Sequence, residues 1–183
     1  MTALLEVPAI RQRAARLSVA DFHRLGEGLR AELLNGILIE KMPKSPLHRL
    51  ITRRIVRALE TQISPELEVW KEDPLTLLDS EPEPDAAVIR KSPDQYATSH
   101  PTTAELVVEV AISSLEIDRL KALIYAEAGV SEYWIVCPEE KQVEIYRQPS
   151  PTGYAERIVL AAPAVLTCTA LPSVSVDLAA LFA

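Results

Sequence analysis

The chain has 183 residues, of which 48% are hydrophobic and 25% charged, and its formal net charge is −7. This length is sufficient for one domain with its own hydrophobic core. The acidic balance argues against a protein that coats nucleic acid with its whole surface, because phosphate contacts need Lys and Arg. It leaves room for a local basic surface.

The two cysteines, Cys137 and Cys168, stand far apart in the sequence. Their spacing argues against a zinc site or a disulfide framework and favours a reducing cytosol. Pro163 and Pro172 interrupt the apolar C-terminal stretch, and the N-terminus lacks the basic start and apolar run of a signal peptide. We therefore predict a cytoplasmic protein without a membrane segment.

The first predicted elements are an arm and a short helix. Residues 1–17 carry several arginines and few core-like residues, so we expect a flexible N-terminal arm before one domain over residues 18–183. Ser18 is a helix N-cap for residues 19–25, and Asp21 stands at the position of a capping-box acid. Gly26 and Gly28 end this helix.

A hairpin and a longer helix follow. Asn35-Gly36 lies between two apolar runs, and this pair favours a tight hairpin turn because both turn positions need a positive φ. Ser45-Pro46 reads as an N-cap followed by proline at the first helical position. Apolar residues at helical spacing then predict a helix to about Gln62.

The remaining chain alternates between predicted strands and helices. Residues 67–79 are expected to be extended, as two strand segments broken at Pro74, and a short strand covers residues 84–90. A polar loop spans residues 91–101. Residues 105–112 read as a buried central strand, and the helix over residues 116–129 ends at Gly129. Three further strands cover residues 131–138, 141–147 and 154–160, and a short helix ends the chain. This order predicts a single α/β domain with a mixed central sheet flanked by helices.

Two acidic residues stand out within the apolar strands. Asp85 begins one strand and Glu109 lies inside the strongly apolar run Leu106–Ile112. An ionised carboxylate in such a strand is costly without a cation or hydrogen bonds. One isolated acid of this kind favours a structural salt bridge or a glutamate at the sheet edge that points to water. Two acids on neighbouring strands, followed by a lysine, favour a metal site. Carboxylate oxygens are the ligands that Mg²⁺ prefers.

The motifs also resemble those of a known family. In content and order, ELLNG, His48, PEPDAAV, LVVEVAISS and DRLKALIYAEAGVSEYWIV are similar to the Uma2-like family (DUF820), with a match from about Asp21 to Arg147. The resemblance implies the restriction-endonuclease-like fold of the PD-(D/E)XK superfamily. It also implies a Mg²⁺-dependent nuclease centre, with Mn²⁺ as a substitute, which hydrolyses phosphodiester bonds in DNA.

The resemblance assigns roles to individual residues. Asp85 and Glu109 become the motif acids and metal ligands, and the backbone carbonyl of Val110 adds a ligand. The motif lysine usually lies two residues after the glutamate, where this chain has Ala111. The resemblance points to Lys121, on the following helix, as its substitute, so that the catalytic set is Asp85, Glu109 and Lys121. If Lys121 is catalytic, its replacement by Ala is expected to slow cleavage while leaving folding intact.

Three further residues are candidates for a place beside this set, one from the family pattern and two from their spacing to Lys121. Glu32 matches an acid close to the centre and is either a metal ligand or an ordinary hairpin acid. Tyr125 lies one turn after Lys121, where it orients the lysine, contacts substrate or belongs to the core. Asp118, three residues before Lys121, is expected to be its structural partner. Cys137 replaces an acid common in the family, and the segment 113–116 lacks its frequent Ser-Pro pair.

The helix after Ser45 carries a basic stripe. Arg49, Arg53 and Arg57 are spaced by four, and no acid occurs between Lys41 and Leu59. This stripe is either a solvated helix face or a surface for the phosphate backbone. We predict nucleic-acid binding by these arginines together with Lys44 and His48.

Two other functions remain open from the sequence. The chain could be a non-catalytic member of the same fold that binds nucleic acid or a protein. A small-molecule hydrolase or a structural assembly domain fits the acidic surface, but no nucleophile motif or phosphate-binding glycine loop supports it. Cutting both DNA strands suits a homodimer, and apolar residues near Tyr133, Trp134 and Ile145 supply either its interface or the core.

Overall fold

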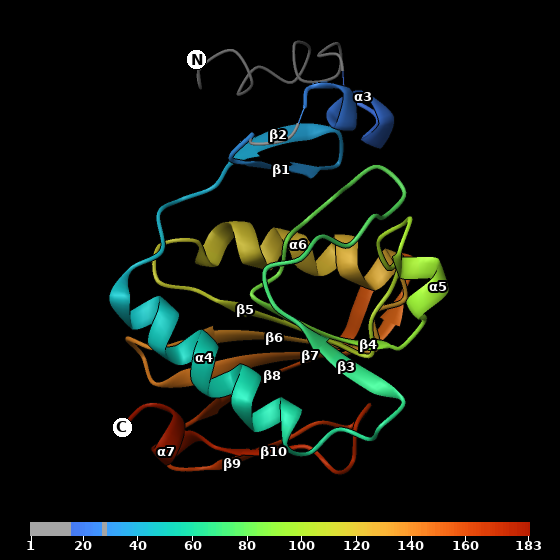
Figure 1. The fold of residues 1–183 in the computed structure, drawn as a ribbon. Helices are drawn as coiled ribbons and strands as arrows, with labels where there is room; N and C mark the ends of the chain where they lie inside the picture. The colour runs from blue at the N-terminus through green and yellow to red at the C-terminus, as the bar shows by residue number, and fades with distance from the viewer. Residues whose placement is uncertain (1–15, 27–28) are drawn as a thin grey trace.

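A mixed six-stranded sheet forms the centre of the protein (Figure 1). The computed structural model describes residues 16–26 and 29–183. The strands follow one another across the sheet in chain order, and only β5 and β6 are parallel while all other neighbours are antiparallel. They are β3 (Leu67–Trp70), β4 (Ala86–Arg90), β5 (Leu106–Val110), β6 (Glu132–Cys137), β7 (Gln142–Ser150) and β8 (Gly153–Ala161). The predicted mixed α/β fold is confirmed.

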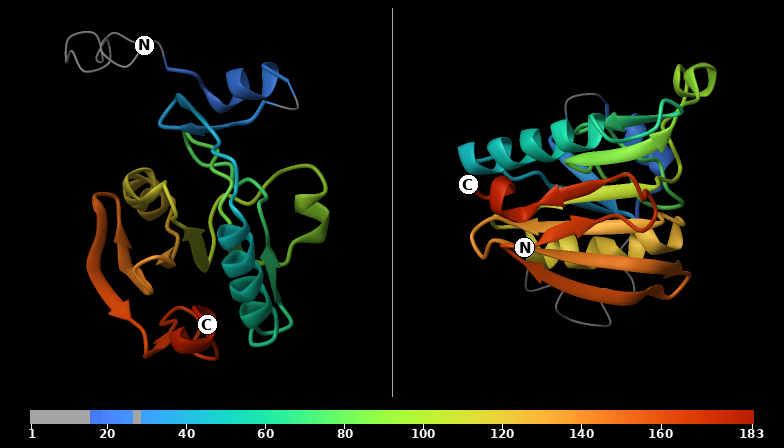
Figure 2. Two further views of the ribbon diagram at one scale, coloured as in Figure 1. Left: turned by 90° about the vertical axis from the view of Figure 1, so that its left-hand side faces the viewer. Right: turned by 90° about the horizontal axis from the view of Figure 1, so that it is seen from below.

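Two helices cover opposite faces of this sheet, as the left view of Figure 2 shows. On one face, α4 (Pro46–Glu60) packs Ile51 and Ile55 against Val108 and other residues of one core cluster. On the other face, α6 (Leu115–Glu127) packs against Val107 in a second cluster. Successive strand side chains point to opposite faces, so β5 contributes alternately to the two clusters. The parallel β5–α6–β6 unit therefore fixes α6 beside the end of β5.

A hairpin and a short helix precede α4 in the chain. The strands β1 (Ala31–Leu34) and β2 (Ile37–Glu40) pair antiparallel around Asn35 and Gly36, whose φ values are +49° and +73°. The predicted turn is therefore confirmed. Helix α3 (Val19–Arg24) has the predicted capping box between Ser18 and Asp21.

The predicted N-terminal arm is described only at its end. Residues 1–15 lie outside the described part of the chain, as does Gly28. The N–H of Leu17 donates to the Gly36 carbonyl at 2.9 Å, so residues 16 and 17 lie against the hairpin.

Three predictions about local structure were wrong. The strand segment predicted directly after Pro74 is absent, since residues 75–79 form no strand. The N–H groups of Leu75 and Thr76 donate instead to the carbonyls of Pro82 and Pro101, in two different loops. The loop over residues 91–101 contains a short helix, α5 (Pro93–Tyr96). Near the C-terminus, β9 (Val165–Thr167) and β10 (Ser175–Asp177) form a two-stranded sheet that the sequence did not indicate, before α7 (Leu178–Leu181).

The apolar residues of β6 and β7 belong to the core. Tyr133 and Trp134 are fully buried and Ile145 is almost so, so these residues are not free to form a dimer interface. Among the described helices, none combines the length and apolar character that a membrane crossing requires.

Candidate active site

The two predicted motif acids meet where β4 begins and β5 ends. These strands are antiparallel, with Ala86 opposite Val108, so Asp85 lies beside Glu109. The Asp85 N–H points to Glu109 Oε2 at 3.4 Å, and the Val110 N–H donates to Asp85 Oδ2 at 2.8 Å. Both acids are only 4% exposed. The topology thus brings together two acidic residues that are 24 residues apart in the sequence.

Glu109 points to the face of the sheet that α6 covers. Lys121 Nζ lies 2.9 Å from Glu109 Oε1, and the Tyr125 hydroxyl donates to the same oxygen at 3.0 Å. Lys121 and Tyr125 are one helical turn apart, so both project from the face of α6 that meets the sheet. Tyr125 is fully buried and also packs against Tyr133, with ring centroids 4.9 Å apart.

Lys121 is the centre of a buried group of three carboxylates. Besides Glu109, it contacts Glu32 Oε2 at 2.9 Å and Asp118 Oδ1 at 3.8 Å. Glu32 comes from β1 and also accepts the N–H of Glu83 at 2.7 Å. Asp118 accepts the Ser114 hydroxyl at 2.6 Å. The hairpin is therefore joined to the site through Glu32, whose carboxylate is engaged by Lys121 and Glu83.

The charges in this cluster are unequally compensated. Burial raises the pKa of Glu109 to about 8, with Asp118, Asp85 and Glu32 adding to the effect and Lys121 opposing it. Burial alone would lower the pKa of Lys121, but Glu109, Glu32 and Asp118 raise it above its ordinary value. The ammonium therefore keeps its proton, whereas ionisation of all three carboxylates around it would place more negative charge there than one lysine offsets.

The other side of Asp85 faces the start of α4. Lys44 Nζ lies 2.8 Å from Asp85 Oδ1, and His48 Nε2 lies 2.9 Å from Asp85 Oδ2. Burial would raise the pKa of Asp85, but the hydrogen bond from His48 and the charge of Lys44 lower it overall. The structure thus places Lys44 and His48 against the acids, apart from the arginine stripe with which the sequence grouped them.

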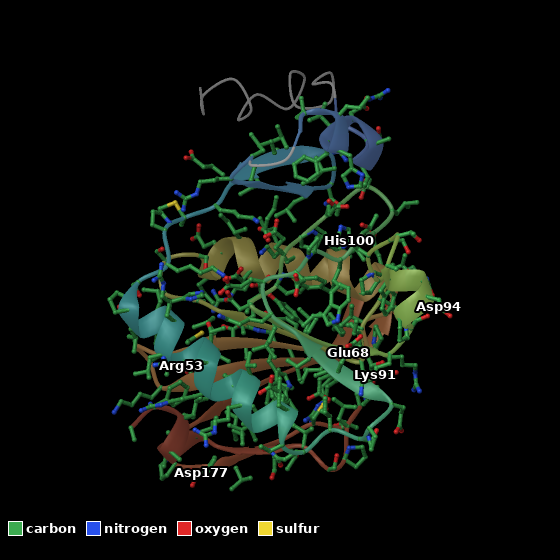
Figure 3. All side chains as sticks on the ribbon, viewed as in Figure 1. Arg53, Glu68, Lys91, Asp94, His100 and Asp177 are labelled. Carbon is green, nitrogen blue, oxygen red and sulfur yellow. The ribbon has the colours of Figure 1, made fainter. Side chains whose placement is uncertain are left out.

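The arginine stripe runs along the outer side of α4. Arg49, Arg53 and Arg57 are exposed, and Figure 3 labels Arg53 on this helix. Within the described residues, no ion pair involves these three side chains, whereas Arg54 donates to the carbonyls of Leu181 and Ala183 at 2.8 and 2.7 Å. The stripe begins one residue after His48 and continues away from the acid cluster.

One further residue at the site, Glu72, was not predicted from the sequence. Glu72 Oε1 lies 3.2 Å from Lys44 Nζ, so that Lys44 bridges Glu72 and Asp85. Glu72 has a φ of +58°, which a residue with a side chain rarely adopts, and its N–H donates to the Pro84 carbonyl at 3.1 Å. Sequence patterns for turns favour Gly or Asn in this conformation, so a glutamate carries no such signal.

Comparison with known proteins places the chain in a family. Residues 19–179 match the family model Uma2, described as "Putative restriction endonuclease". The chain belongs to the Uma2 family. Among solved structures, it is similar to one described as a "putative nuclease belonging to DUF820" from Anabaena variabilis ATCC 29413. The TM-score is 0.76 at 19% identity, covering 91% of this chain and 97% of the other, so this likeness concerns the fold. No curated protein matches the chain.

Two departures from the expected Uma2 pattern now have a structural setting. Cys137 is the last residue of β6, is buried and lies opposite Gln142 of β7. Ser114 is the N-cap of α6 and gives its hydroxyl to Asp118, so this serine supports the acid beside Lys121.

The donor set of this Uma2 protein fits a divalent cation of the magnesium type. In the described part of the chain, no three His, Cys, Asp or Glu side chains form a preformed metal cage. Mg²⁺ is commonly held by one or two carboxylates plus waters and substrate phosphate. Asp85 and Glu109 each supply a carboxylate at the junction of β4 and β5. The pKa of Glu109 is raised mainly by burial and further by neighbouring acids, so a cation would stabilise its ionised form.

Proposed function

We propose that this Uma2 protein is a metal-dependent endonuclease that hydrolyses phosphodiester bonds in DNA. The observation that carries the proposal is the meeting of Asp85, Glu109 and Lys121 in one buried cluster. They come from the start of β4, from β5 and from α6. Ala111 stands where the motif lysine is usual, and Lys121 brings an ammonium to the motif glutamate from the neighbouring helix.

Asp85 and Glu109 would hold the metal, together with the backbone carbonyl of Val110. Mg²⁺, or Mn²⁺ in its place, supplies positive charge for the phosphate and lowers the pKa of a water when bound. The Val110 N–H and His48 fix one oxygen of Asp85 through hydrogen bonds of 2.8 and 2.9 Å. Such contacts to ligating carboxylates hold them in place for the metal.

Lys121 acts in this proposal through its charge. Its pKa is raised by the carboxylates around it, so it does not serve as a general base near neutral pH. An ammonium fixed beside the acids offsets the negative charge that develops on the phosphate during hydrolysis. Glu32 and Asp118 orient Lys121, and Tyr125 orients Glu109 through its hydroxyl.

The stripe of Arg49, Arg53 and Arg57 would bind the DNA backbone. It is exposed, starts beside His48 and therefore leads away from the acid cluster along α4. Contacts of this kind position a duplex without reading its sequence. A homodimer would let two such sites act on the two strands of a duplex.

Incubation of the purified protein with plasmid, linear and single-stranded DNA tests the proposal. Cleavage is expected with Mg²⁺ or Mn²⁺ and not with EDTA, and Asp85→Asn and Glu109→Gln should abolish it. These variants replace a carboxylate by an amide of similar shape, so their thermal melting checks that they fold. If the wild type cuts no nucleic acid under any of these conditions, the non-catalytic alternative is favoured.

A further inference from the structure

Lys44 occupies a position between two acids of different exposure. Its Nζ lies 2.8 Å from Asp85 Oδ1 and 3.2 Å from Glu72 Oε1. The Asp85 side chain is 6% exposed and the Glu72 side chain 38% exposed, with Lys44 itself at 31%. One end of this bridge is therefore buried at the proposed metal centre, and the other is open to solvent.

The two oxygens of Asp85 are held in different ways. Oδ2 accepts both the Val110 N–H and His48 Nε2, from a strand and a helix that are part of the packed core. For Oδ1 the structure gives a single partner among the described side chains, Lys44 Nζ. Lys44 precedes Ser45, the N-cap of α4, and so lies in the connecting segment before the helix. Oδ1 is the oxygen that a cation can reach by moving one side chain.

Glu72 is held where it can receive that side chain. Its backbone adopts a left-handed conformation that is unfavourable for a glutamate. The Glu72 N–H donates to the carbonyl of Pro84, the residue before Asp85, and this hydrogen bond stabilises the conformation. Disfavoured backbone conformations of this kind persist only where the surrounding structure enforces them, and they gather at functional sites. Here the conformation keeps a second carboxylate beside Lys44.

We propose that Lys44 is a metal-responsive positioning residue that neutralises Asp85 until a divalent cation binds Oδ1, and that it then leaves Asp85 and keeps its contact with Glu72 alone. The inference rests on the proposed metal centre of the nuclease. The exchange keeps the charge at Asp85 balanced in both states, because one cation leaves as another arrives. It also moves the ammonium toward the more exposed carboxylate, at the solvent side of the bridge.

This proposal predicts tighter metal binding when the competing ammonium is removed. Lys44→Met keeps the length of the side chain without its charge, and we expect its affinity for Mn²⁺, measured by calorimetry, to rise about fivefold. The matched control is Lys41→Met, which breaks the Lys41–Glu83 pair of similar exposure. Its affinity should stay within about twofold of wild type. Unchanged or weaker Mn²⁺ binding by Lys44→Met would overturn the proposal.

A double-mutant cycle with Glu72→Gln separates this movement of Lys44 from a simple charge effect. Removing the acceptor should weaken Mn²⁺ binding when Lys44 is present and have less effect in Lys44→Met, with a coupling of about threefold or more. An equal effect in both backgrounds would mean that Glu72 acts on the metal through space and that Lys44 does not move.

A measurement on the wild-type sequence guards against variants that fail to fold. Lysines carrying ¹³C-methyl groups by reductive methylation give one signal each, and the Lys44 signal, assigned with Lys44→Arg, should shift on adding Mg²⁺ while that of Lys41 stays fixed. An unmoved Lys44 signal at saturating metal overturns the proposal, as does a wild type that binds neither cation. Metal binding with the predicted coupling but without DNA cleavage would leave the movement of Lys44 intact and contradict the nuclease function alone.

Discussion

Lys121 Nζ lies 2.9 Å from Glu109 Oε1, although the motif position two residues after the glutamate is Ala111. The contact arises because α6 crosses back over the end of β5 and turns one face toward the sheet. The lysine is 4% exposed and contacts carboxyl groups from three different elements. The expectation that its removal would leave folding intact does not agree with this burial.

Replacement of Lys121 by Met is expected to destabilise the protein by about 3 kcal/mol, because it leaves buried carboxylates without their partner. Chemical denaturation without metal measures this change. Lys91→Met, at an exposed lysine, should change the free energy of unfolding by no more than about 0.5 kcal/mol. Where Lys121→Met is still folded, its cleavage rate should fall roughly a hundredfold. Cleavage by this variant at the rate of the wild type would mean that Lys121 does not belong to the catalytic set.

The sequence predicted the parts of the fold that depend on local chemistry. The hairpin follows from Asn35-Gly36, and the start of α4 follows from Ser45-Pro46. The pairing of β9 with β10 depends instead on distant contacts, since buried Glu132 accepts the N–H of Thr169 at 2.8 Å. Strands of three residues have no periodicity that a sequence pattern can detect.

The same difference between local patterns and distant contacts applies to the site. The acid pair and Lys121 followed from motif order, but the contact of Lys44 with Asp85 spans 41 residues and has no local signature. His48 was different, because a signal existed. It stands three residues before Ile51 and seven before Ile55, which places it on the buried face of α4. Grouping it with the basic residues overlooked this spacing.

Metal binding should release a proton near neutral pH. The pKa of Glu109 is raised to about 8 without metal, so this carboxyl is largely protonated at pH 7 and must ionise to bind a cation. Calorimetry in buffers of different ionisation enthalpy should find about one proton released at pH 7 and almost none at pH 9. Mn²⁺ affinity should therefore rise with pH up to about 8 and then level off.

Two variants distinguish the source of this proton. Glu109→Gln should release none. Asp85→Asn should bind metal more weakly but still release the proton, because the pKa of Asp85 is lowered and this acid is already ionised before metal binds. Proton release that persists in Glu109→Gln would assign the titration to another group.

The raised pKa of Glu109 also predicts that the metal-free protein loses stability as pH rises from 4.5 to about 8. In that range the folded state keeps a proton on Glu109 that the unfolded state has already lost.

The arginine stripe should control the salt dependence of DNA binding. Replacing Arg49, Arg53 and Arg57 by Ala removes up to three phosphate contacts, so the slope of log K against log salt should flatten by roughly 0.9 for each contact. Arg54→Ala on the same helix is the control, because Arg54 holds the C-terminal carbonyls. It should lower stability and leave the slope unchanged. An unaltered slope in the triple variant would make the stripe a solvated helix face.

Tyr125→Phe tests whether the orientation of Glu109 matters for function. The change removes the 3.0 Å hydrogen bond to Glu109 Oε1 and keeps the ring that packs on Tyr133. Loss of one hydrogen bond should cost about 1 kcal/mol of stability. Contacts that orient metal ligands typically change metal affinity or activity by a factor of about 10–100, so Mn²⁺ affinity and cleavage should both fall by about tenfold.

The matched control for this variant is Tyr154→Phe. The Tyr154 hydroxyl donates to the Val130 carbonyl at 2.8 Å, so its removal also deletes one partly buried hydrogen bond. The two variants should lose similar stability in thermal melting, but only Tyr125→Phe should bind Mn²⁺ more weakly. Equal metal affinities and cleavage rates would show that Tyr125 stabilises the core without positioning Glu109.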